Sequence, residues 1–71
     1  MAIDKDDLNT RFTYQRPTED TIPKFEVLRN TGKAFAELIV ECCPPSREQS
    51  LAITKLEEVI FWANASIARK K

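Results

Sequence analysis

The chain has 71 residues, with eleven basic and eleven acidic side chains, no histidine and two cysteines. A chain this short makes one domain near the lower limit for folding alone, so we expect a single domain over residues 1–71. The net charge of zero argues against a general nucleic-acid coat. Adjacent Cys42 and Cys43 without histidine argue against a metal site. No apolar run approaches the roughly 20 residues needed to span a membrane.

The first 21 residues are expected to form a short helix followed by an arm. The segment IDKDDLNT (3–10) is compatible with a short acidic helix. Residues 11–21 are expected to be irregular or extended, because Pro17 excludes regular helix. Successive side chains of an extended segment point oppositely, so Phe12, Tyr14 and Arg16 would share one side.

A first long helix is predicted over residues 22–43, with Pro23 tolerated in its first turn and Pro44 and Pro45 ending it. Its apolar residues recur at spacings of three and four, which is typical of one buried stripe. The residues of this stripe are Phe25, Leu28, Gly32, Phe35, Ile39 and Cys42. We expect Gly32 to permit a close approach of two helices.

A second long helix is predicted over residues 46–69, with Ser46 as its N-cap and Gln49 completing a capping box. Its matching stripe consists of Ile53, Leu56, Ile60, Ala63 and Ile67. Two apolar stripes joined by a short turn predict an all-α fold, an antiparallel two-helix hairpin.

Apolar side chains outside the stripes predict a homo-oligomer. Val59, Trp62 and Ser66 remain on other faces of the second helix, and Val27 and Leu38 remain on the first. The N-terminal segment is expected to fold back over part of this surface, but about ten residues are too few for both flanks. A core of this size rarely supplies more than roughly 3–5 kcal/mol. We therefore expect Val59, Trp62 and Ser66 to lie between subunits.

The charges predict an anionic ligand. Antiparallel pairing gathers eight of the eleven cations at one end, namely Arg11, Arg16, Lys24, Arg29, Lys33, Arg69, Lys70 and Lys71. On the first helix this order opposes the macrodipole, which favours a bound anion; the alternative is pairing with Glu19, Asp20 and Glu26. Tyr14 beside guanidinium groups suits a base and its phosphates, while Phe12 is either part of this face or a core plug. A small nucleotide is the favoured ligand.

No residue set in the sequence indicates catalysis. There is no histidine, no glycine-rich phosphate loop, and no serine or cysteine nucleophile beside a base. Glu57 and Glu58 are neighbours on a helix and point about 100° apart, so they are not a poised carboxylate pair. We expect a binding protein without catalytic residues, metal or cofactor.

Two segments carry a family resemblance: RFTY (11–14) and PPSREQSLAITKLEEVIFWANASIARK (44–70). They closely resemble the phage anti-CBASS cyclic-oligonucleotide sponge family, whose hairpin domain is shared with Thoeris sponges. The resemblance implies a phage-encoded homohexamer that sequesters cyclic dinucleotides, such as cyclic GMP-AMP, and in some cases cyclic trinucleotides, without cleaving them. The pockets of this family lie between subunits.

The resemblance also implies site residues. Tyr14 matches the family's aromatic residue near the start of the chain, and Arg69 matches its C-terminal arginine. The family's helical cation matches either Arg29 or Lys33, and the trinucleotide pocket draws on the stretch near Arg29 and Thr31. The expected location is the cytoplasm of an infected bacterium, with no membrane and no duplex DNA as partner. The alternative is a small helical assembly or regulatory protein with a basic DNA- or protein-binding end.

Overall fold

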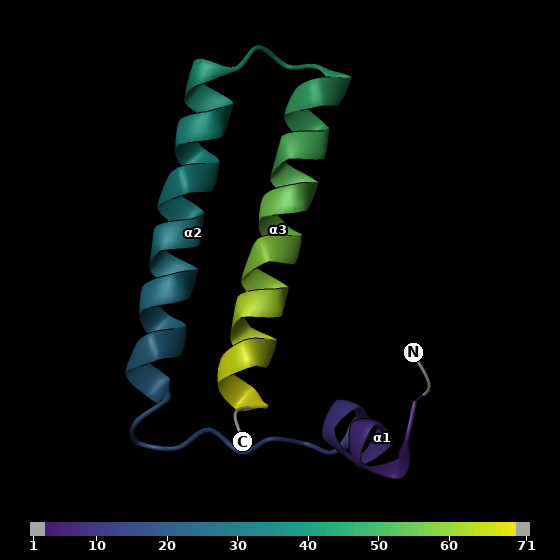
Figure 1. Cartoon of the computed structure of the whole chain (residues 1–71). Helices are drawn as coiled ribbons and strands as arrows, with labels where there is room; N and C mark the ends of the chain where they lie inside the picture. The colour runs from purple at the N-terminus through teal and green to yellow at the C-terminus, as the bar shows by residue number, and fades with distance from the viewer. Residues whose placement is uncertain (1–2, 70–71) are drawn as a thin grey trace.

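A computed structural model describes residues 3–69, which contain three helices and no strand. They are α1 (Lys5–Phe12), α2 (Ile22–Cys42) and α3 (Arg47–Ala68). Helices α2 and α3 run antiparallel side by side, and the short α1 lies beyond the end of the hairpin (Figure 1). The all-α hairpin expected from the two apolar stripes is confirmed. Lys70 and Lys71, two of the expected end cations, lie outside the described residues.

Helix α1 begins at a complete capping box. The Asp7 amide donates to Asp4 Oδ1 at 2.9 Å, and the Asp4 amide donates to Asp7 Oδ2 at 3.5 Å. Arg11 in the last turn complements the helix dipole. The helix therefore continues to Phe12, and the expectation that Phe12 belongs to an extended segment is wrong.

Helix α1 contacts neither α2 nor α3 within the described part of the chain. Figure 1 shows α1 beyond the C-terminal end of α3, joined to α2 by an extended arm. The expectation that the N-terminal segment folds back over the hairpin is therefore wrong for the isolated chain. Eight residues bury too little apolar surface to offset the entropy of fixing the arm. Phe12 is 82% exposed and is not a core plug.

One apolar seam joins the two long helices. The stripe predicted on α3 is half-buried throughout, at Ile53, Leu56, Ile60, Ala63 and Ile67. On α2 the half-buried residues are Phe25, Leu28, Gly32, Ala36 and Ile39. Ala36 takes the place predicted for Phe35, and Phe35 and Cys42 are exposed, which corrects both assignments.

Small residues set the seam's spacing. A Cβ atom at Gly32 would lie 2.9 Å from Cδ1 and 3.0 Å from Cγ1 of Ile60, closer than van der Waals contact permits. Gly32 therefore lets Ile60 reach the α2 backbone, as the sequence predicts. Ala36, one turn further along, keeps the helices close. A phenylalanine at that level would push them apart, so Phe35 lies outside the seam.

The turn between α2 and α3 is closed by side chains. Ser46 caps α3, because its Oγ accepts from the Gln49 amide at 3.1 Å. The Gln49 side chain does not return to Ser46; its Nε2 donates to the Cys43 carbonyl at 2.9 Å. The predicted capping box is thus replaced by a bond that ties the first turn of α3 to the end of α2.

Most apolar surface of the chain stays in contact with solvent. No residue in 3–69 is buried; the best covered are half-buried. The accessible surface is 6216 Å², whereas a compact monomer of this mass exposes about 4,500 Å². The radius of gyration is 15.4 Å, against about 11 Å for a compact chain of this length. The surplus of roughly 1,700 Å² is about twice what one partner buries in a standard-sized interface.

Candidate functional site

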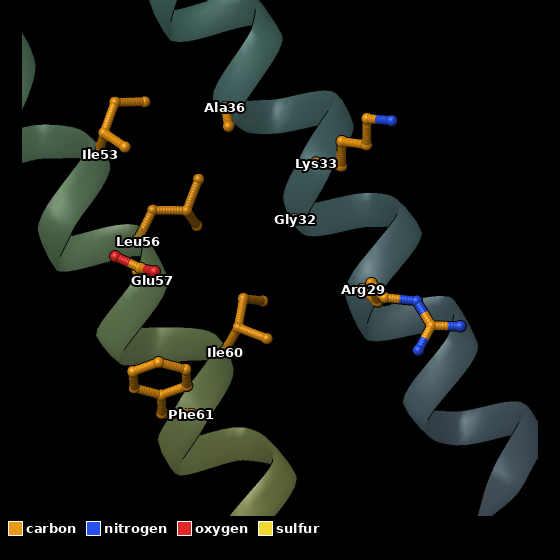
Figure 2. A pocket seen from close by; sticks show the side chains of 9 residues that line it. All are labelled: Arg29, Gly32, Lys33, Ala36, Ile53, Leu56, Glu57, Ile60 and Phe61. Carbon is orange, nitrogen blue, oxygen red and sulfur yellow. The ribbon is translucent and has the colours of Figure 1, made fainter.

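A groove along one flank of the hairpin combines apolar and charged residues. It encloses about 280 Å³ and has a floor formed by Gly32, Ala36, Ile53, Leu56 and Ile60. Leu56 and Ile60 point between the helices, while two cations on α2 point away from α3 (Figure 2). These cations, Arg29 and Lys33, form one rim, and Glu57 and Phe61 of α3 form the other.

The α2 rim of this groove carries two like charges without an ion-pair partner in residues 3–69. Arg29 and Lys33 are four residues apart on α2, so their like charges face the same side and repel each other. Within residues 3–69 the single ion pair joins Lys55 and Glu58, at 3.4 Å. Neither Arg29 nor Lys33 therefore has a carboxylate partner within salt-bridge distance in this range. The alternative reading, in which these two cations pair with nearby acids, is therefore not seen in residues 3–69.

A second hollow of about 280 Å³ lies where the arm enters α2. Arg16 and Lys24 line it, together with Ile67 and Ala68 at the end of α3. The arm is held there by a closed turn, in which the Thr18 amide donates to Thr21 Oγ1 at 2.8 Å and the Thr18 carbonyl accepts from the Thr21 and Ile22 amides. This turn positions the base of the arm against the end of the hairpin.

A third hollow lies on the outer side of α3. It is lined by Glu58, Phe61, Trp62, Ala65 and Arg69. Arg69 is the C-cap residue of α3, is half-buried, and donates its amide to the Ala65 carbonyl at 2.8 Å. The backbone of Arg69 is therefore fixed by the helix end, next to two aromatic side chains.

One chain brings only some of the six predicted ligand residues together. Arg29 and Lys33 share the flank groove, and Arg69 lies in the hollow on α3. Tyr14 lies in the arm and is 81% exposed, and Phe12 ends α1. The expected cluster of cations at one end does not hold, because Arg29 and Lys33 lie in the middle of α2.

Thr31 lies on a different side of α2 from the flank groove. Two residues of helix turn the side chain by about 200°, so Thr31 cannot line a pocket with Arg29 in the same chain. Thr31 is exposed and lines none of the hollows described above. A ligand that contacts both residues would have to lie between chains.

Two residues of the flank groove were not singled out from the sequence. Glu57 and Phe61 form its α3 rim and are one turn apart on that helix. Their spacing of four places them on one face, but which face borders α2 depends on the seam. Only the pairing of the two helices shows that this face meets Arg29 and Lys33.

The predicted interface residues all remain exposed in the single chain. Val59 and Trp62 are 59% and 68% exposed, and Ser66 is also exposed. No helix in the described range is both long and apolar enough to cross a membrane. No group of three or more candidate metal ligands occurs among residues 3–69.

The fold and these hollows define a small all-α hairpin whose surfaces suit binding between chains. The family model described as Acb2/Tad1, hairpin domain, matches residues 4–68. The chain therefore belongs to the Acb2/Tad1 hairpin family, the family of anti-CBASS and anti-Thoeris sponge proteins. Proteins of this family are binding sponges rather than enzymes. No curated protein and no solved structure matches the chain.

Proposed function

We propose that this protein sequesters cyclic dinucleotide messengers without cleaving them, and so blocks CBASS-type antiviral signalling. The observation that carries the proposal is the pair of like charges, Arg29 and Lys33, on the rim of an apolar groove without an ion-pair partner in residues 3–69. Phosphates would relieve the repulsion between the two cations, and the apolar floor would cover a base. Family membership supports the same function.

The proposed pocket lies between subunits, because one chain does not bring its parts together. In this arrangement Tyr14 stacks on a base, and Arg69 and one α2 cation hold phosphates. Tyr14 is 81% exposed and lies in an arm that can reach a neighbouring chain. Phe12, two residues earlier at the end of α1, would add a second aromatic surface.

We propose a homohexamer as the functional form, with Val59, Trp62 and Ser66 at one of its interfaces. The support is the roughly 1,700 Å² of surplus surface, which corresponds to about two standard-sized interfaces for each chain. A simple two-fold dimer has one interface for each chain. A larger closed assembly needs at least two contacting surfaces on each chain, either two self-complementary ones or the two sides of one head-to-tail interface.

Cyclic trinucleotides are the second proposed ligand class. They would bind in a separate pocket between subunits that Thr31 borders, since Thr31 lies on the other side of α2 from Arg29. Saturating the protein with a cyclic dinucleotide should then leave trinucleotide binding intact. Mutual displacement of the two ligands would instead indicate one shared pocket.

The test is a calorimetric titration of the purified protein with a panel of cyclic di- and trinucleotides, followed by denaturation and analysis of the released ligand. We expect stoichiometric binding, in proportion to the number of subunits, and recovery of the ligand intact. Linear product from a nuclease-free preparation would contradict the proposal. Salt-sensitive binding to DNA that depends on its length, without cyclic nucleotide binding, would instead support the DNA-binding alternative.

The proposed place of action is the cytoplasm of an infected bacterium.

A further inference from the structure

A second stripe runs along α2 and is exposed throughout. It consists of Lys24, Val27, Thr31, Ala34, Leu38 and Glu41, at spacings of 3, 4, 3, 4 and 3. These are the spacings of a helix-pairing seam, and all six residues are exposed, whereas the stripe facing α3 is half-buried. The stripe therefore has the pattern of a packed face but no partner in its own chain.

The order of residue types along this α2 stripe is the same from either end. A charged residue stands at each end, an apolar residue comes next, and two small residues occupy the centre. If a second copy of α2 lies antiparallel across it, Lys24 meets Glu41, Val27 meets Leu38, and Thr31 meets Ala34. In a parallel pair Lys24 would lie beside Lys24 and Glu41 beside Glu41, and these like charges would repel each other. The stripe is thus complementary to itself only in the antiparallel direction.

We propose that the α2 stripe packs antiparallel on the α2 stripe of a second copy, as the second interface of the assembly. This inference rests on the assembly proposed above, and it names a surface that differs from the Trp62 face of α3. The surplus surface corresponds to about two interfaces for each chain. Leu38, Val27 and the neighbouring Phe35 are 52%, 63% and 53% exposed, so this face carries a large apolar area.

A hollow on the same face fits this packing. It measures about 420 Å³ and is lined by Pro23, Lys24, Val27, Leu28 and Ile67. The antiparallel pair places Leu38 of the second copy opposite Val27, at the wall of this hollow. A leucine side chain entering a hollow between α2 and α3 is the knob-into-hole contact of paired helices.

The pairing also explains the order of charges on α2. That helix has no acidic residue in its first turn and no basic residue in its last turn, which is the reverse of what its dipole favours. Glu37 and Glu41 are also four residues apart and repel each other. An antiparallel second copy places its Lys24 beside Glu41, and the two helix dipoles then point in opposite directions. The order of charges that destabilises α2 in a single chain therefore stabilises an antiparallel pair of α2 helices.

The first experiment is zero-length cross-linking of the intact protein with a carbodiimide, followed by peptide mass spectrometry. Lys24 and Glu41 lie about 25 Å apart along one helix, so a bond between them can form only between copies. We expect this cross-link, and we expect it to disappear when the protein is diluted below its assembly concentration. Its absence from an assembled sample in which Lys24 and Glu41 are both labelled by single-ended reagents would overturn the proposal.

The second experiment exchanges the charges, with helicity checked by circular dichroism. Lys24→Glu alone and Glu41→Lys alone should each weaken assembly at least about fivefold, because each creates two repulsive contacts for every pair of chains. The double variant Lys24→Glu/Glu41→Lys restores both contacts and should assemble as the parent does. The control Lys24→Glu/Glu57→Lys has the same charges, but Glu57 lies on α3 at the rim of the flank groove and not on the α2 stripe, so it should stay weak. Failure of the first double variant to recover would overturn the pairing.

The same measurements distinguish this inference from the proposed function. The cross-link and the charge exchange do not depend on ligand, so a protein that binds no cyclic nucleotide can still show both. The alternative occupant of the stripe is α1 of another copy. If Leu8→Asp weakens assembly as much as Leu38→Glu and the double variant is no weaker than either, α1 covers the stripe, and the antiparallel α2 pair is wrong.

Discussion

Arg29 and Lys33 are the residues whose placement the sequence leaves most open. Both lie on the rim of the flank groove, and the negative charge of Glu57 lies on the opposite rim. A bound phosphate would be attracted by the two cations and repelled by Glu57. The balance among three side chains, rather than the net charge of the chain, therefore decides whether this groove holds an anion.

Replacing Glu57 with glutamine tests that balance. Glu57→Gln should tighten cyclic dinucleotide binding about two- to fivefold, because it removes a like charge from a partly exposed site while preserving shape. The measurement is a calorimetric titration at two salt concentrations. Glu48→Gln, near the turn on the same helix, is the matched control and should change nothing. Equal affinities for all three proteins would exclude phosphate binding in this groove.

Alanine substitutions test the proposed contacts individually. Tyr14→Ala or Arg69→Ala should weaken cyclic dinucleotide binding at least about tenfold, since a lost stack costs roughly 1–3 kcal/mol and a charge-assisted contact roughly 1.5–3 kcal/mol. Arg29→Ala and Lys33→Ala, measured separately, identify the phosphate contact. Assembly should persist in all four variants, as checked by light scattering. If all four bind as tightly as the parent, the pocket lies elsewhere.

At the scale of the helices, the seam depends on small side chains. Gly32 and Ala36 have little or no side chain and so let the two helices come close, and Ile60 fills the space that Gly32 leaves. A glycine in mid-helix costs about 1 kcal/mol relative to alanine. The close packing against Ile60 offsets that cost. The seam also contains Asn64, whose Oδ1 is buried without a hydrogen-bond partner in residues 3–69.

A bulky residue at Gly32 should separate the two helices. Gly32→Leu is expected to lower the free energy of unfolding by about 1–3 kcal/mol, because the side chain overpacks against Ile60. Urea denaturation at fixed protein concentration measures the change. Asn30→Leu, at an exposed position of the same helix, should stay within about 0.5 kcal/mol. An equal effect of both variants would mean that the close approach at Gly32 contributes nothing.

At the scale of the whole molecule, the single chain does not complete its own core. No residue in 3–69 is buried, and thirteen large apolar side chains in that range remain exposed. In the assembly proposed above, most of the stability of the folded protein would come from contacts between chains. The melting temperature should consequently rise with protein concentration. A melting temperature that is constant over a hundredfold range of concentration would indicate a stable monomer.

The Trp62 face of α3 provides a second test of assembly. Trp62 is 68% exposed in the single chain, so Trp62→Glu leaves the seam unchanged but puts an unpaired charge into the proposed interface. Light scattering at micromolar concentration should report smaller particles than for the parent. The control Lys55→Glu alters the charge of an exposed residue on the same helix. Assembly of Trp62→Glu at parental strength would remove Trp62 from the interface.

The sequence by itself determined the helical hairpin and its family. Periodic apolar residues, prolines and the Ser46 cap act locally, so they define where α2 and α3 begin and end without knowledge of the partner. The stripe on α3 was predicted residue by residue for the same reason. The segments 11–14 and 44–70 were enough to indicate the family that the match over residues 4–68 shows.

Only the tertiary structure decided which residues share a surface. Phe35 and Ala36 are adjacent in sequence, and the close approach of two backbones at Gly32 selects the smaller one for the seam. The same packing brings Glu57 and Phe61 opposite Arg29 and Lys33, and leaves Thr31 on the other side of α2. The position of α1 depends on weak contacts that a local pattern does not encode. Helical periodicity shows which residues lie on one face, but the steric fit between two helices determines which face is covered.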